Sequence, residues 1–311
     1  MSHAKRPAAL VIGESLIDIV PGAEGGVLEH PGGSPMNVAV GLGRLGRPTM
    51  LATWFGRDTH GELIERHLRQ SDVELVPGSD AAERTPTAQV LFDANGSARY
   101  VFDLAWRMPA VPSDVQPRVV HTGSIGASLR PGADAVLDAC RALRPTTIIS
   151  YDPNARPQAI GPADGVRDLM ESFVATADIV KASDEDLAWL YPDDDPARSA
   201  AAWLGRGPSL LVLTRGAHGV VAMSHEATAT FAAPDVVTVD TVGAGDAFMA
   251  ALLDGLWSMG LLGPERRSEL ATMPKSRLGR LAAYASHAAG ITLSRPGADP
   301  PWRDELPPIR D

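Results

Sequence analysis

Short apolar runs rich in β-branched residues recur along this chain of 311 residues, and segments with helical periodicity separate them. The runs have the length of β-strands and cover residues 8–12, 119–121, 147–151, 178–181 and 209–214. Strands that alternate with helices predict a mostly parallel central sheet with helices on both faces. The expected fold class is therefore α/β, with ligands bound near the polar residues that follow the strands: Glu14, Asp152, Lys181 and Arg215.

Two stretches break this alternation. Residues 27–29 with their flanking glycines, and residues 87–103 with the turn Asp93-Ala94-Asn95-Gly96, are typical of short strands and a hairpin. We expect a single domain over residues 1–311, with a small β-sheet lid contributed by residues 14–33 and 86–107.

The overall charge and the cysteine count exclude several classes of protein. A formal net charge of −10 argues against binding to nucleic acid or to an anionic membrane surface. Cys140 is the single cysteine, so an intramolecular disulfide cannot form. Neither a signal peptide nor an apolar run of membrane-spanning length is present, which predicts a cytoplasmic protein.

A glycine-rich turn precedes the apolar stretch 247–259, and its sequence is Asp240-Thr241-Val242-Gly243-Ala244-Gly245-Asp246. Such a turn at the start of a helix presents free backbone N–H groups and the positive end of the helix dipole, which together bind a phosphate. Asp246 would then lie in the first helical turn, able to take a proton from a hydroxyl that attacks the phosphorus. The alternative is a plain acidic residue that favours a helix N-terminus.

The same segment resembles, without a mismatch, the D-T-x-G-A-G-D signature of the PfkB carbohydrate kinases. Further segments resemble family motifs in the right order: Gly13-Glu14 with Asp18, Pro31-Gly32-Gly33-Ser34-Pro35-Met36-Asn37-Val38-Ala39, and Arg295-Pro296-Gly297-Ala298. The resemblance covers nearly the whole chain. It implies a ribokinase-like fold and an ATP-dependent kinase that transfers the γ-phosphoryl group to a hydroxyl of a small carbohydrate.

This resemblance also implies roles for individual residues. Asp246 would be the catalytic base, over the phosphate-binding turn Gly243, Ala244 and Gly245. The sugar would be bound by Asp18, Gly32, Gly33 and Asn37, next to Asp246. Arg156 would lie near the transferring phosphoryl group or an acidic substrate, and a salt bridge to a lid or loop acid is its alternative.

The ATP groove would be lined by Lys181, Thr214, Arg215, Gly216 and Gly219, with Gly243 and Gly245 at the phosphates and Ser286 where many relatives have an asparagine near the adenine. Mg²⁺ would arrive with ATP. The family's N-x-x-E segment, which organises the magnesium water shell, appears here as Ser183-Asp184-Glu185-Asp186, so Asp186 is the expected contact through water. Asp240 would contribute to a site for a monovalent cation such as K⁺, although no hydroxyl follows the Arg295 turn.

Fructose is the first expected substrate, because Gly13-Glu14, the glycine pair and Asp152-Pro153-Asn154-Ala155-Arg156 together resemble fructokinases. The alternatives are 2-keto-3-deoxygluconate, whose carboxylate could meet Arg99, Tyr100 and Arg107, and ribose or a nucleoside. A catalytically inactive relative that binds sugar or nucleotide is the non-enzyme alternative.

A homodimer through the lid is expected from the resemblance and from the alternation of Val90, Phe92, Tyr100 and Phe102. His121 and Cys140 are interpreted as structural residues.

Overall fold

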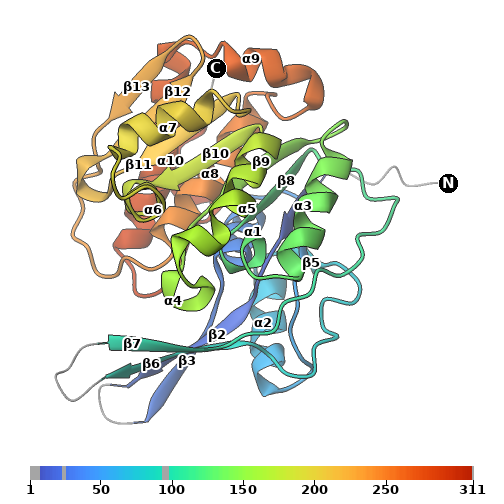
Figure 1. Ribbon diagram of the computed structural model, residues 1–311. Helices are drawn as coiled ribbons and strands as arrows, with labels where there is room; N and C mark the ends of the chain where they lie inside the picture. The colour runs from blue at the N-terminus through green and yellow to red at the C-terminus, as the bar shows by residue number, and fades with distance from the viewer. Residues whose placement is uncertain (1–7, 23–25, 93–97, 310–311) are drawn as a thin grey trace.

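The computed structural model describes residues 8–22, 26–92 and 98–309. Its larger sheet has nine strands in the order β13-β12-β11-β10-β9-β8-β1-β4-β5 (Figure 1). Neighbouring strands are parallel from β11 to β5. Strand β12 pairs antiparallel with β11 on one side and with β13 on the other. The bounds are β1 (Ala9–Ile12), β4 (Thr49–Ala52), β5 (Val73–Leu75), β8 (Val119–Gly123), β9 (Ile148–Asp152), β10 (Ile179–Ser183), β11 (Leu210–Thr214), β12 (Val220–Ser224) and β13 (Thr228–Phe231). The predicted mostly parallel sheet is confirmed.

Successive strand residues point to opposite faces of this sheet, and both faces are apolar. Helices therefore cover both faces. Val11 and Val119 belong to the core on one face, and Leu10 and Val120 to the core on the other. The first face packs against α1 (Ser34–Arg44), α2 (Thr59–Gln70), α8 (Ala244–Ser258), α9 (Arg267–Ala271) and α10 (Lys275–Leu293). The second packs against α3 (Gly132–Leu143), α4 (Pro157–Ile160), α5 (Ala163–Thr176), α6 (Asp184–Leu190) and α7 (Pro196–Leu204).

Short 3₁₀ turns complete the connections: η1 (Ile125–Ala127), η2 (Gly216–His218), η3 (Pro264–Arg266) and η4 (Arg303–Glu305). Within the described ranges, no helix combines the length and the apolar character that a membrane crossing needs.

A separate four-stranded sheet projects from the body, at the lower edge of Figure 1. Its order is β3 (Val27–Gly32), β2 (Leu16–Pro21), β6 (Thr87–Phe92) and β7 (Ala98–Asp103). The hairpin predicted over residues 87–103 is present as β6 and β7, while its turn Asp93-Ala94-Asn95-Gly96 lies outside the described residues. That this sheet acts as a lid stays a prediction.

The predicted polar residues lie at or near the carboxyl ends of their strands, with three differences from the sequence interpretation. Asp152 is the last residue of β9 and not the first residue after it. Lys181 lies inside β10 rather than after it, because the strand continues to Ser183. Helix α8 begins at Ala244, three residues before the apolar run, because Gly243 adopts a left-handed φ of 76° and starts the helix there. Asp246 is consequently in the first helical turn, as predicted.

Candidate active site

Three hydrogen-bond donors from distant parts of the chain orient the carboxylate of Asp246. Ser34 Oγ donates to Oδ1 at 2.7 Å, and Asn37 Nδ2 donates to Oδ2 at 2.8 Å. Asn154 Nδ2 lies 3.3 Å from Oδ1. Because Asp246 is only 5% exposed, these donors replace water around a charged group and fix its direction.

Asn154 follows β9 with a left-handed φ of 34°, a conformation that asparagine tolerates better than most residues. Its amide also donates to Ser34 Oγ at 2.7 Å. Ser34 begins α1 directly after the glycine pair, so the start of α1, the loop after β9 and the start of α8 meet at one point.

The glycine-rich turn before α8 can hold no larger residue at Gly243. A Cβ there would lie 2.5 Å from the Cβ of Ala298. Asp240 ties the two segments together, since its Oδ2 accepts from the Gly297 N–H at 2.8 Å and its Oδ1 from the Val242 N–H at 3.0 Å. Burial opposes ionisation of Asp240, but these N–H groups prevail and hold its pKa below the usual value.

The glycine pair lies against the first strand of the small sheet. A Cβ on Gly32 would meet Asp18 Oδ2 at 2.1 Å, and one on Gly33, whose φ is 113°, would meet the Glu14 carbonyl oxygen at 2.6 Å. Burial raises the pKa of Asp18 to about 6, although Arg156 and His30 act in the opposite direction. The absence of side chains at the pair therefore allows its backbone to lie beside a half-buried carboxylate.

Glu14 is a buried carboxylate that the sequence indicated as a polar residue after a strand and as part of the Gly13-Glu14 motif, without a role of its own. The Gly126 N–H donates to its Oε2 at 2.7 Å, and it is 4% exposed. Burial raises its pKa to about 7, against the opposing effects of its hydrogen bonds and of Arg156. It fixes η1 to the end of β1, directly beside the glycine pair.

Arg156 is exposed at the mouth of this region. Its guanidinium donates to the Ala155 carbonyl at 3.1 Å, and its charge lowers the pKa of both Asp18 and Glu14. In the described part of the chain, none of the ion pairs involves Arg156, so its alternative assignment as a lid salt bridge finds no support there.

A cavity of about 320 Å³ opens beside the start of α8. Five of the predicted residues line it: Arg156, Lys181, Asp186, Thr214 and Gly245. Among the described residues, the lining does not include five others predicted for the nucleotide: Arg215, Gly216, Gly219, Ser286 and Gly243. The first three form the turn after β11, and Ser286 is 2% exposed within α10.

Asp186 is held by protein donors rather than left free for a metal. Its Oδ1 accepts from the Ala155 N–H at 2.7 Å, and its Oδ2 accepts from the Ser183 N–H at 2.9 Å and Oγ at 2.7 Å. Ser183 and Asp186 thereby form a capping box at the start of α6. Over the described ranges, no group of three or more His, Cys, Asp and Glu side chains could hold a metal ion.

Lys181, which lines this cavity, forms a buried ion pair with Asp152, with 2.8 Å between Nζ and Oδ2. Their side chains are 5% and 1% exposed. Burial alone would lower the pKa of Lys181, but the carboxylate of Asp152 raises it above the usual value, and Asp186 and Asp246 act in the same direction.

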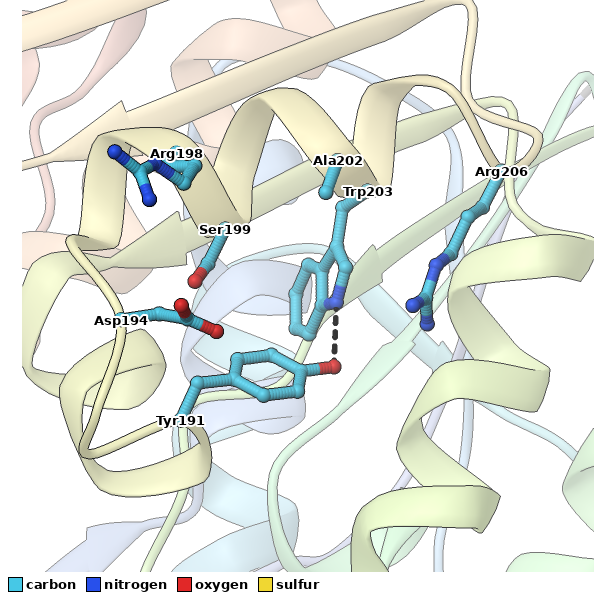
Figure 2. Close-up of a pocket in the computed structure, with 7 residues that line it drawn as sticks. All are labelled: Tyr191, Asp194, Arg198, Ser199, Ala202, Trp203 and Arg206. Atoms are coloured by element: carbon cyan, nitrogen blue, oxygen red, sulfur yellow. Dashed lines mark hydrogen bonds between the residues drawn. The ribbon is translucent and has the colours of Figure 1, made fainter.

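A smaller cavity lies elsewhere, at α7 (Figure 2). Trp203 Nε1 donates to the Tyr191 hydroxyl at 2.9 Å, and that hydroxyl in turn donates to Glu171 at 2.5 Å. These aromatic polar groups are satisfied by one another, so we interpret this hollow as part of the packing of α7.

Comparisons with known proteins decide the family. Residues 7–305 match the model of the pfkB family carbohydrate kinases. The chain belongs to the PfkB family. It is a sugar kinase, and the predicted ribokinase-like fold is confirmed.

Individual relatives of this PfkB kinase agree with that membership. It is 34% identical over 299 residues to a fructokinase from Klebsiella pneumoniae, across 93% of this chain and 96% of that protein. The structure of a sugar kinase from Pyrococcus horikoshii in complex with ATP aligns with a TM-score of 0.77 at 29% identity, covering 96% of both chains. Aminoimidazole riboside kinase from Salmonella enterica, complexed with aminoimidazole riboside and an ATP analog, gives 0.78 at 25% identity, over 96% and 98% of the chains. An ATP-binding kinase is thereby supported for the PfkB chain.

Sequence reasoning did not predict that Asn154 contacts Asp246, and it missed Ser34 altogether. Ser34 stands inside the recognised motif between Gly33 and Asn37, yet no role was inferred for it. Its position as the first residue of a helix after a glycine pair was the available signal, because a hydroxyl there points out of the helix start.

Proposed function

We propose that this kinase transfers the γ-phosphoryl group of ATP to fructose. The observation that carries the proposal is the agreement, over 93% of the chain, with a protein named fructokinase. The geometry is compatible with a neutral sugar, since the amides of Asn37 and Asn154 beside Asp246 and the Asp18 carboxylate beside Gly32 are hydroxyl-binding groups.

In this proposal, the sugar lies between the small sheet and α1. Asp18 accepts hydrogen bonds from sugar hydroxyls, while the backbone of Gly32 and Gly33 approaches the sugar closely. Asn37 donates through Nδ2 to Asp246, which leaves its carbonyl oxygen to accept from a hydroxyl. Asp246, whose carboxylate is aligned by its three hydrogen-bond donors, takes the proton of the attacking hydroxyl.

The phosphates of ATP would lie over the N–H groups of residues 243–245 and in the adjoining cavity. The backbone N–H groups and the positive helix end stabilise the charge on the equatorial oxygens, and Arg156 would add a mobile cation at the mouth. Lys181, Thr214 and the turn of Arg215, Gly216 and Gly219 would line the rest of the groove, with Ser286 towards the base.

Mg²⁺ is proposed to be held mainly by phosphate oxygens and water, where it would neutralise phosphate charge. Asp186 fits a contact through water only, because both its oxygens already accept protein hydrogen bonds. A K⁺ site is also proposed at Asp240. Two of the four acceptor positions of its carboxylate are used by N–H groups, so the other two could face the cation.

A second candidate substrate is 2-keto-3-deoxygluconate. The observation that favours it is Arg156, an exposed guanidinium close enough to Asp18 and Glu14 to lower the pKa of each. The carboxylate of this substrate could pair with the guanidinium of Arg156. Arg107 is also exposed, and the side chain of Arg99 lies outside the description.

The test is ADP formation by the purified kinase with Mg-ATP and a panel of fructose, ribose, adenosine and 2-keto-3-deoxygluconate. Fructose should give a kcat/KM at least about tenfold above the other acceptors. The keto acid should lose its turnover in Arg156→Gln far more than fructose does, which separates the two candidates. Fructose turnover at the background rate, with another acceptor active, would refute the substrate assignment. Chelation of Mg²⁺ should abolish activity, and exchange of K⁺ for tetramethylammonium tests the Asp240 site.

We also propose a cytoplasmic homodimer that pairs through the small sheet, which would close the substrate site as a lid. Apolar side chains are exposed on three of its strands, where soluble proteins usually place polar residues: Val27, Leu28, Leu91 and Val101. Light scattering should give a dimer mass for the purified protein. Val101→Asp with Leu28→Asp should give a monomer that remains folded, and an unchanged dimer would exclude this interface.

A further inference from the structure

The N-terminal part of α2 lies against the small sheet that carries Asp18 (Figure 1). Strand β2 is an inner strand of that sheet, between β3 and β6. Asp18 on β2 is paired with His30 on β3 and with Ala88 on β6. The position of the Asp18 carboxylate therefore depends on how these two neighbouring strands are held.

The carboxylate of Asp58, just before α2, makes more hydrogen bonds than a helix cap requires. Its Oδ1 accepts from the Gly61 N–H at 2.8 Å, which caps α2. The same oxygen accepts from Thr85 Oγ1 at 2.6 Å, and Oδ2 accepts from the Thr85 N–H at 2.8 Å. Burial opposes ionisation of Asp58, but the hydrogen bonds from Thr85 and Gly61 prevail and lower its pKa. The two bonds to Thr85 are therefore additional to the cap.

Thr85 is fixed directly beside β2. It is 4% exposed, and only Pro86 separates it from the start of β6. The carbonyl oxygen of Pro86 accepts from the N–H of Ile17 at 3.0 Å, and Ile17 is the residue before Asp18. A short series of contacts thus joins the start of α2 to the proposed sugar-binding carboxylate.

Two glycines let Thr85 come this close to α2. A Cβ on Gly56 would lie 2.7 Å from the Cα of Arg84, and one on Gly61 would lie 1.9 Å from the carbonyl oxygen of Gly56. The Gly56 N–H donates to the Thr85 hydroxyl at 3.1 Å, so this hydroxyl accepts one hydrogen bond and donates another to Asp58. Backbone and side chain both hold Thr85 in place.

A weaker contact reaches the strand on the other side of β2. His60 Nε2 on α2 lies 3.3 Å from Glu29 Oε1 on β3, and Glu29 is paired with Ile19 on β2. The two side chains are 27% and 37% exposed, and pairs so open to solvent contribute little. The main connection is therefore the one from Asp58 to Thr85.

We propose that Asp58 and Thr85 are positioning residues for the sugar. The Asp58 carboxylate holds Thr85, and Thr85 holds the start of β6 against β2, so that Asp18 faces the sugar hydroxyls. This inference rests on the proposed role of Asp18 in sugar binding. Loss of the contact should weaken sugar binding and spare nucleotide binding, because only the sugar is proposed to contact the small sheet.

Thr85→Val keeps the size of the side chain and removes the hydroxyl. It should raise the Kd of the sugar about tenfold, because a misplacement of about 1 Å costs about 100-fold and a smaller one is expected here. The Kd of an ATP analogue should stay within about twofold of wild type. Thr85→Ser retains the hydroxyl and should restore sugar binding to within about twofold of wild type.

Asp58→Asn tests the other partner of the contact. Asparagine caps a helix as well as aspartate does, but its single side-chain oxygen cannot replace both carboxylate oxygens towards Gly61 and Thr85. Asp58→Asn should therefore weaken sugar binding by a factor similar to that of Thr85→Val. The double variant should bind no more weakly than either single variant, because all three lack the same contact.

The matched control is Thr147→Val, the same substitution at another buried threonine. Thr147 is 1% exposed, and its Oγ1 donates to the carbonyl of Pro117 at 3.1 Å. It directly precedes β9, at the opposite end of that strand from Asp152. Thr147→Val should lower the urea midpoint, as Thr85→Val does, and leave the Kd of the sugar unchanged.

The experiment is isothermal titration of each purified variant with the best acceptor of the sugar panel, and separately with a non-hydrolysable ATP analogue and Mg²⁺. Urea unfolding followed by circular dichroism checks the fold. If Thr85→Val fails to fold, Asp58→Asn carries the test. Wild-type sugar affinity in both Thr85→Val and Asp58→Asn would overturn the inference in favour of a purely structural contact. Equal losses of affinity for the sugar and for the ATP analogue would also overturn it.

Asp18→Asn in the same titration separates this inference from the proposed function. If Asp18→Asn binds the sugar as tightly as wild type, the proposed sugar site is wrong and the inference falls with it. If Asp18→Asn binds weakly while Thr85→Val and Asp58→Asn bind normally, the inference alone is wrong.

Discussion

Two aspartates on one helix should respond to the same substitution in opposite ways. Asp246 and Asp254 both lie on α8 and are both buried, at 5% and 0% exposure. Asp246 accepts hydrogen bonds from neutral donors, whereas Asp254 bonds to Arg47 at 2.6 Å, to the Tyr284 hydroxyl at 2.6 Å and to a second guanidinium, that of Arg303. The first carboxylate is arranged for chemistry and the second for stability.

Asp246→Asn keeps the shape of the side chain and leaves the carbonyl oxygen to accept from Ser34 or Asn37. We expect it to lower kcat by about 10²- to 10⁴-fold, the usual effect of losing a general base. The free energy of unfolding should change by about 1 kcal/mol, because the loss of hydrogen bonds to a carboxylate is offset by removing the cost of burying a charge. Asp254→Asn leaves two guanidinium groups without their partner and should destabilise the fold by about 3 kcal/mol with kcat nearly unchanged.

The assay combines steady-state ADP formation with urea unfolding followed by circular dichroism. Because the two variants carry the same chemical change on one helix, each serves as the control for the other. Asp246→Asn with more than a tenth of wild-type kcat would refute the assignment of the base. An equal loss of stability in both variants would refute the distinction between the two carboxylates.

Three further perturbations follow from the site. Gly243→Ala should reduce kcat/KM by at least about tenfold, because its Cβ would press on Ala298. The control Gly260→Ala, at a similar φ of 69° but with open space around it, should lower stability by only about 1 kcal/mol and leave turnover unchanged. Equal kinetics for the two variants would contradict the steric argument. Sugar affinity should fall up to about tenfold per pH unit below about 6 as Asp18 protonates, and isothermal titration of Asp18→Asn should show weak binding without that dependence. The stability of Glu14→Gln minus that of wild type should increase by about 3 kcal/mol from pH 4.5 to pH 8. Wild type loses stability as the pH rises through the folded pKa of Glu14, about 7, because the buried carboxyl must then ionise, whereas glutamine does not. The same difference in urea midpoint between the two proteins at both pH values would exclude this.

The fold class was predictable from local patterns because the strands β1, β8, β9 and β11 of the central sheet are largely apolar runs with helical segments between them. The register of β10 was less accessible. The run recognised in the sequence covers residues 178–181, yet the strand continues to Ser183, because an ion pair with Asp152 satisfies the buried charge of Lys181. A sequence shows that a lysine interrupts an apolar pattern, but it does not show the carboxylate on the neighbouring strand that compensates it.

The part of the site that lies in one segment was also predictable. The turn of residues 240–246 carries its own signature, and its glycines are needed where the sequence places them. Asp186 was harder to interpret, because its local role as a capping partner of Ser183 and its distant contact with the Ala155 N–H both occupy the carboxylate. Local motif matching indicated a metal-water ligand, whereas the contacts show first a residue that fixes the loop after β9.

The base could be named from the sequence, whereas the side chains that donate hydrogen bonds to it could not. Ser34 and Asn37 are separated from Asp246 by 212 and 209 residues, so their contacts exist only once α1 and α8 have packed together. Asn154 reaches the same carboxylate from a loop whose backbone Asp186 holds. The carboxylate is therefore aligned by the tertiary fold as a whole, and any substitution that loosens the packing of α1 on α8 should lower kcat before it unfolds the chain.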